Sequence, residues 1–156
     1  MTLANIIPDI RCSRSLGKSY SQARANRALV VVKRIVGEIV DAHVLLRQLV
    51  ETAELAELAG DDSRLNICRA RQAQLVEKVS QCREELDILG VELTDPVRGI
   101  VDFPAVVGGR CGMFCWRLGD DVVGFWHAND ESCAHRRPLP MTLRLPTLPR
   151  MRWSVR

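Results

Sequence analysis

Aromatic residues are scarce in this 156-residue chain, at 4% of the total. Most of them fall between Phe103 and Trp126, so any core outside that segment must be mainly aliphatic. Hydrophobic residues make up 47% and charged residues 26%, which is typical of one soluble globular domain of ordinary length.

Long apolar runs are also missing, since none approaches the ~20 residues that span a bilayer. The first ten residues have no basic stretch ahead of their apolar ones and no clear cleavage site. We therefore predict neither a signal peptide nor a membrane anchor, and we expect a cytoplasmic protein with no membrane partner.

The familiar catalytic motifs are absent as well. The chain has no P-loop, dinucleotide-binding glycine motif, nucleophile elbow or two-metal carboxylate set. The Gly108-Gly109 pair lacks the following helix that phosphate binding requires. The sequence therefore assigns no catalytic residue, no cofactor and no metal site, and it leaves open whether the protein is an enzyme.

Acidic residues are absent from positions 132–156, which contain six arginines. Because the net charge is +3, the preceding residues carry −3. We expect nucleic-acid binding only, if at all, through this basic end of the chain. Its Pro- and Arg-rich part, 140–156, is predicted to be a disordered tail, and 1–19 a flexible leader. Residues 20–139 between them are predicted to form a single domain.

The strongest pattern is that of a long antiparallel helical hairpin over residues 21–89. Ser21 is a good N-cap, and apolar residues then recur at three- and four-residue steps to about Ala59. Asp62 or Ser63 suits the N-cap of the next helix, which ends at Gly90, and the short connection makes the helices antiparallel. Each helix presents one seam of residues to the other: Leu29, Val32, Val36, Ile39, His43, Leu46, Val50 and Ala53 in the first, and Leu65, Cys68, Gln72, Leu75, Val79, Cys82, Leu86 and Leu89 in the second.

The apolar stripe of the first helix is wider than a two-helix seam. Val31, Ile35, Leu45 and Leu49 flank the seam and need a cover. The rest of the chain could supply part of it and a second copy the remainder, so we predict a homo-oligomer, in the form of a dimeric four-helix arrangement.

After Gly90 the pattern changes to that of short strands. We predict strands at 99–103, ended by Pro104, at 111–117 and at 122–127, with a hairpin turn at 118–121. The predicted fold class is α+β, a coiled-coil-like helical hairpin followed by an antiparallel sheet of about three strands within a β-rich region, 91–131.

A tight turn at 118–121 sets an expected register, in which Phe114 opposes Phe125 and Trp116 opposes Val123. Alternation of side chains then divides the last two strands into two faces. A slip by one residue would reverse this on one strand. One face, packed on the helices, carries Phe114, Trp116, Val123, Phe125 and His127, and the other carries Met113, Cys115, Arg117, Val122 and Trp126.

Six cysteines are present, at positions 12, 68, 82, 111, 115 and 133. Without a secretory signal we expect reduced thiols. Cys111 and Cys115 on one strand would be about 13 Å apart at ~3.3 Å per residue. This is too far to share a tetrahedral zinc ion, so we interpret them as small buried hydrophobic residues.

The densest polar segment runs from Trp126 to Pro138. Its possible metal ligands are His127, Asp130, Glu131, Cys133 and His135. Glu131 could also act as a general base, and Arg136 and Arg137 could hold a phosphate or carboxylate, although no spacing matches a known mechanism. A solvated loop after a strand is the alternative. The candidate ligand-binding residues are Arg117, Trp126, His127, Glu131 and Arg137.

Several segments together resemble an uncharacterised bacterial family, the domain of unknown function 2203, over about residues 20–139. They include the helix start at 20–29, the segment from Arg98 to Pro104, Cys-Trp-Arg-Leu-Gly at 115–119, Gly-Phe-Trp-His at 124–127 and Arg-Arg-Pro-Leu at 136–139. The chain departs from the family pattern at Arg24 and at 132–135. The resemblance implies a small cytosolic bacterial protein and brings no activity with it.

Two hypotheses on function follow. The first is a non-enzymatic interaction or scaffold module that self-associates through its helices. The alternative is a small-ligand or metal-binding protein, or an enzyme, with its site around Trp126, His127 and the arginines that follow.

Overall fold

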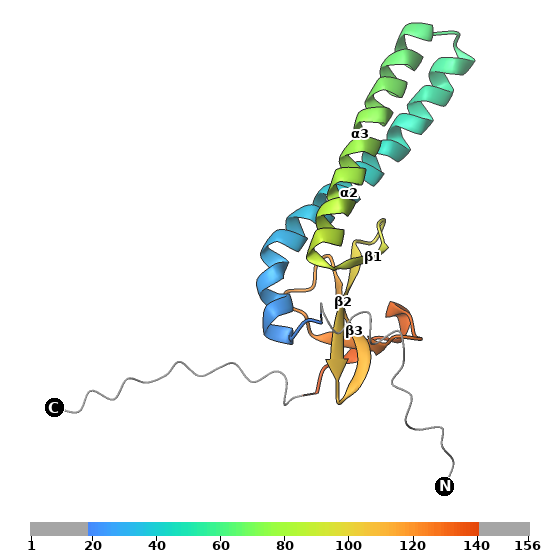
Figure 1. Cartoon of the computed structure of the whole chain (residues 1–156). Helices are drawn as coiled ribbons and strands as arrows, with labels where there is room; N and C mark the ends of the chain where they lie inside the picture. The colour runs from blue at the N-terminus through green and yellow to red at the C-terminus, as the bar shows by residue number, and fades with distance from the viewer. Residues whose placement is uncertain (1–18, 141–156) are drawn as a thin grey trace, which may run out of the picture.

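A computed structural model describes residues 19–140, which form a long helical hairpin followed by a small sheet (Figure 1). The hairpin consists of α2 (Gln22–Leu58) and α3 (Asp62–Leu89). The sheet lies beside the base of the hairpin, and the far end of the hairpin extends beyond it (Figure 1). Apart from positions 19 and 140, the predicted leader and the predicted tail lie outside the described residues.

Local capping interactions set the helix ends. The Ser21 hydroxyl accepts a hydrogen bond from the Arg24 amide at 3.2 Å, as expected for an N-cap. Asp61 caps α3 in the same way, so the predicted cap at Asp62 or Ser63 was placed one or two residues too late. Gly90 ends α3 at φ 71°, a left-handed conformation that glycine adopts without strain.

The predicted seam of α3 is confirmed along its whole length. All eight of its residues, from Leu65 to Leu89, are buried or half-buried, whereas every other α3 residue is exposed. Seven of the eight residues in the predicted seam of α2 are buried or half-buried, and Val50, at 47% exposed, is the exception. Ala42 and Ala56, which lie outside the predicted seam, are buried. A strict heptad row drifts by about 20° per heptad around a straight helix, which accounts for this shift.

The sheet contains five antiparallel strands in sequential order, rather than about three. The two unpredicted strands lie at its edges and are only four and two residues long, too short to show an alternating pattern. The strands are β1 (Glu92–Asp95), β2 (Ile100–Val107), β3 (Arg110–Arg117), β4 (Phe125–Ala128) and β5 (Arg137–Pro138).

Strand β2 continues through Pro104, where the sequence predicted that it would end. Pro104 pairs with Met113 of β3, and its carbonyl accepts a 2.6 Å hydrogen bond from the Tyr20 amide on the other side. Beyond Asp102, β2 has no β1 partner, and its edge there meets Tyr20, which forms a single parallel bridge with Ala105. A proline at such a position breaks no ladder hydrogen bond.

The predicted register of the last hairpin is wrong by one residue. Phe114 pairs with Trp126, and Phe125 pairs with Cys115. The connection is longer than a tight turn because Val123 is held by α2: its amide donates to Asn26 Oδ1 at 2.8 Å and its carbonyl accepts from Gln22 at 2.9 Å. This one-residue difference in register places each side chain of β4 on the opposite face of the sheet from the one predicted.

The core lies between one face of the sheet and the first half of α2. The sheet contributes Val101, Phe103, Phe114 and Trp116, and Ile35 of α2 is fully buried against this cluster. The sheet therefore supplies part of the cover that the wide stripe on α2 required.

Gly99 permits this close packing between sheet and helix. It adopts φ +66°, and a Cβ there would lie 2.9 Å from Leu118 Cβ and 2.9 Å from Val36 Cγ1 of α2. Both the backbone conformation and the space therefore require glycine.

Candidate functional site

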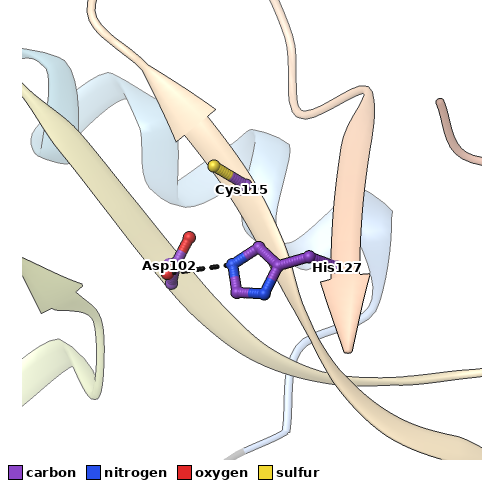
Figure 2. A group of neighbouring side chains, drawn as sticks. All are labelled: Asp102, Cys115 and His127. Carbon is purple, nitrogen blue, oxygen red and sulfur yellow. Dashed lines mark hydrogen bonds and ion pairs between the residues drawn. The ribbon is translucent and has the colours of Figure 1, made fainter. Parts of the chain in front are cut away.

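The other face of the sheet carries three side chains able to bind a metal, from three neighbouring strands (Figure 2). Asp102 of β2 pairs directly with Cys115 of β3, and His127 of β4 lies two residues beyond Phe125, the partner of Cys115. Alternation along the strands places all three on one face. One ligand atom from each lies within 4.8 Å of the others, which forms the Asp102–Cys115–His127 cluster.

The cluster is closed to solvent. Asp102 and His127 are each 3% exposed, and Cys115 is fully buried. Charged side chains are almost never buried to this extent without a partner. The described residues contain no other buried charged or polar side chain, so this pair stands apart from the remaining core.

Two hydrogen bonds orient the His127 ring. Its Nδ1 lies 2.9 Å from the Ala128 carbonyl, and its Nε2 lies 3.1 Å from Asp102 Oδ2. A carbonyl oxygen only accepts, so Nδ1 carries a proton. One further proton is then shared between Nε2 and the carboxyl group, and the pair is electrically neutral overall.

Asp102 is incompletely satisfied. Its Oδ1 is buried and has no hydrogen-bond partner among residues 19–140. Burial raises the pKa of Asp102 above its ordinary value, the charge and hydrogen bond of His127 act to lower it, and repulsion from Glu92 raises it further. An unpaired buried carboxylate oxygen is an open position for a cation.

Cys115 forms a disulfide with Cys133, which contradicts the prediction of a reduced thiol at both positions. Their Cα atoms are 6.3 Å apart, within the usual range for a disulfide. Cys111 is disulfide-bonded too. The prediction is confirmed only for Cys68 and Cys82, whose free thiols are buried in the α3 seam.

Cys133 begins a short 3-10 helix, η3 (Cys133–His135), in the loop after β4. Two ion pairs hold this loop, residues 129–136, in place. Arg136 contacts the Asp120 carboxylate at 2.8 Å and stacks on Phe125. Burial opposes ionisation of Asp120, but Arg136 and the Arg117 amide hold its pKa below the ordinary value.

The second ion pair joins Glu131 and Arg137. Glu131 also accepts a hydrogen bond from the Ala128 amide at 3.0 Å, and this bond, followed by Arg137, lowers its pKa. Arg137 stacks on the Trp126 ring, 4.7 Å from its centroid. Both contacts tie the loop to β4 independently of the disulfide.

The five candidate residues from the sequence thus occupy three different places. Trp126, Glu131 and Arg137 meet and hold the loop. His127 points to the opposite face of the sheet, and Arg117 is exposed at the end of β3, where its amide donates to Asp120.

Sequence reasoning did not identify Asp102, and it considered Cys115 only with Cys111. The available signal was an acidic residue in the middle of the apolar strand Ile-Val-Asp-Phe. Asp102, Cys115 and His127 each belong to a segment of the family resemblance, whereas Cys133 belongs to the segment that departs from it.

Comparison with known proteins agrees with that resemblance. The chain matches no curated protein and no solved structure. A family model described as an uncharacterised conserved protein matches residues 18–139, which is most of the chain. The protein therefore belongs to this uncharacterised conserved family, the domain of unknown function 2203.

Proposed function

We propose that this protein binds a divalent transition metal, zinc being the best match, through Asp102, His127 and the reduced thiol of Cys115. The observation that carries the proposal is the buried Asp102–His127 pair, which has an unpartnered carboxylate oxygen and a cysteine sulfur beside it. Carboxylate, imidazole and thiolate are the ligands that zinc takes in proteins.

The hydrogen bonds of His127 fit this role. A metal-bound histidine generally donates its other ring N–H to a carbonyl or carboxylate, as Nδ1 does here to Ala128. Nε2 and Oδ2 are 3.1 Å apart. Two ligands at ~2.0–2.1 Å from a tetrahedral ion would be separated by about 3.3 Å. Binding would replace the shared proton by the metal with little movement of either side chain.

Burial of the cluster favours a structural metal over a catalytic one. Catalytic zinc sites keep a position open for water or substrate. All three residues here are at most 3% exposed, which leaves no such position. We propose that the protein works in the reducing cytoplasm, where Cys115 would be available as a thiolate.

Metal binding can be tested with the full chain reduced by a phosphine and titrated with zinc against a chromophoric chelator. We expect one zinc per chain, lost or weakened more than ~100-fold in Asp102→Asn, since even the loss of a group that only hydrogen-bonds to a ligand costs about 10–100-fold. Asp130→Asn and His135→Ala, at exposed positions of the 129–136 loop, should bind as the parent does. No zinc in the reduced parent, or an unaffected Asp102→Asn, would overturn the proposal.

Self-association through the helices is a second candidate. Val30, Val44, Leu55 and Leu58 are 41–86% exposed. At ~100° per residue they fall within a sector of about 80° on α2. Leu55 and Leu58 belong to the last turn of α2, and the end of the hairpin where α2 meets α3 extends beyond the sheet (Figure 1). We propose that a second copy of the chain packs on this row of residues, giving four helices.

Light scattering over a range of concentrations tests this association. We expect a dimer whose dissociation constant rises at least ~10-fold in Leu55→Gln/Leu58→Gln, since each buried leucine contributes about 1.5–3 kcal/mol. Val122→Gln, a comparably exposed position in the β3–β4 connection, is the matched control. A strict monomer at high concentration would contradict this candidate.

A further inference from the structure

We infer that Cys115 and Cys133 form a thiol–disulfide switch for the metal site, in which the disulfide excludes the metal and the reduced pair supplies two of four ligands. This inference rests on the proposed function and adds its regulation. It follows from the position of the disulfide, because one of its sulfurs belongs to the Asp102–Cys115–His127 cluster.

The cluster alone offers three ligands, one fewer than a closed structural zinc site requires. Cys133 is bonded to Cys115, so its sulfur already adjoins the cluster. Reduction would let the two sulfurs separate from about 2.05 Å to the ~3.8 Å expected around zinc. The resulting set of two cysteines, one histidine and one aspartate is a four-ligand zinc site.

The Cys133 sulfur should stay close to the Asp102–Cys115–His127 cluster after the disulfide is reduced, because other contacts hold the loop of residues 129–136 in place. Arg136 pairs with Asp120 and stacks on Phe125, while Glu131 and Arg137 tie the other part of the loop to β4. Arg136 and Asp120 are both mostly buried, which strengthens their ion pair relative to a surface pair. The loop therefore presents Cys133 to the cluster in both redox states.

A small-molecule disulfide such as oxidised glutathione acts as the oxidant for the protein thiolates. The two zinc-bound thiolates lose two electrons in total and form the Cys115–Cys133 bond, which releases Zn²⁺. The oxidant takes up the two electrons, together with two protons from the solvent, and leaves as two thiols. In the reverse direction, two thiols reduce the protein disulfide and the freed thiolates bind the metal.

The experiment measures zinc in the full chain before and after treatment with oxidised glutathione, followed by reduction. We expect release of the bound zinc on oxidation and its return on reduction. Cys133→Ser should bind zinc more than ~10-fold more weakly than the reduced parent and keep it under the same oxidant. With Co²⁺ as the probe, its thiolate-to-metal absorption should fall to about half that of the parent, as expected for one thiolate instead of two.

Distinct outcomes separate this inference from the proposed function. Equal zinc affinity in Cys133→Ser and the reduced parent would overturn the switch and leave the three-ligand site standing. Zinc retained by a parent in which the Cys115–Cys133 disulfide has formed would overturn both, because the three-ligand site needs the Cys115 thiolate. Absence of zinc from both reduced proteins would overturn the proposed function itself. Cys68→Ser, at a buried free thiol in the α3 seam, is the matched control and should respond to the oxidant as the parent does.

Discussion

Replacing His127 by alanine is expected to lower the free energy of unfolding of the oxidised, metal-free protein by about 3–5 kcal/mol at neutral pH, because it leaves the buried Asp102 without its partner. The loss should depend on pH. Burial already raises the pKa of Asp102, and removing the opposing effects of His127 leaves burial and Glu92, which raise it further. A carboxyl group whose folded-state pKa exceeds its unfolded value destabilises the fold as pH rises between the two.

The difference between variant and parent should therefore be smallest near pH 4, around the ordinary carboxyl pKa, and should grow towards neutrality. Urea unfolding at a series of pH values, with chelator present, measures it. Adding Asp102→Asn to His127→Ala removes the buried charge and should recover about 1–3 kcal/mol at pH 7. A difference that stays constant between pH 4 and 7.5 would rule out a buried charge as its cause.

Trp116→Ala is expected to cost about 3–5 kcal/mol, the usual range for removing a fully buried large aromatic side chain. Trp116 is completely buried between the sheet and α2, and its indole N–H donates to the Asp120 carbonyl at 2.9 Å. The side chain therefore both fills the core and fixes the β3–β4 connection. The midpoint of urea unfolding should fall with an unchanged m-value.

Trp116→Phe separates these two contributions. Phenylalanine keeps most of the ring but leaves the Asp120 carbonyl without its donor, so we expect a loss of about 1–3 kcal/mol. Val122→Ala, in the same connection but 56% exposed, should stay within about 0.5 kcal/mol of the parent. A loss for Trp116→Ala no larger than that of Val122→Ala would contradict this account of the core.

The helical part of the fold was predictable because its signal is repeated. The residues of the α3 seam, from Leu65 to Leu89, recur at the same three- and four-residue spacing. One polar residue among them therefore does not alter the prediction of a helix. The sheet lacks such redundancy. A single long-range contact, Asn26 holding the Val123 amide, lengthened the last connection and reversed the faces of β4. Strand β5 has only two residues, which is too short for an alternating sequence pattern.

The site was less predictable than the fold because its members are far apart in sequence. Asp102 and Cys115 are neighbours because β2 pairs with β3. His127 lies on the same face as these two residues only in the observed β3–β4 register, which differs by one residue from the predicted register. The charged residues of the polar segment after Trp126 were predicted to bind a ligand. In the structure they form ion pairs that hold the loop of residues 129–136 in place. The residues suited to metal binding are instead polar positions isolated within apolar strands.

The short edge strands have a consequence for how copies of the protein can meet. A long exposed edge invites pairing with another chain and hence aggregation. Here β1 has four residues with a register shift, and β5 has two residues and ends in Pro138, which offers no amide hydrogen. With both edges blunted, edge-to-edge pairing of sheets is disfavoured. The self-association proposed above accordingly uses the helical hairpin and needs no sheet edge.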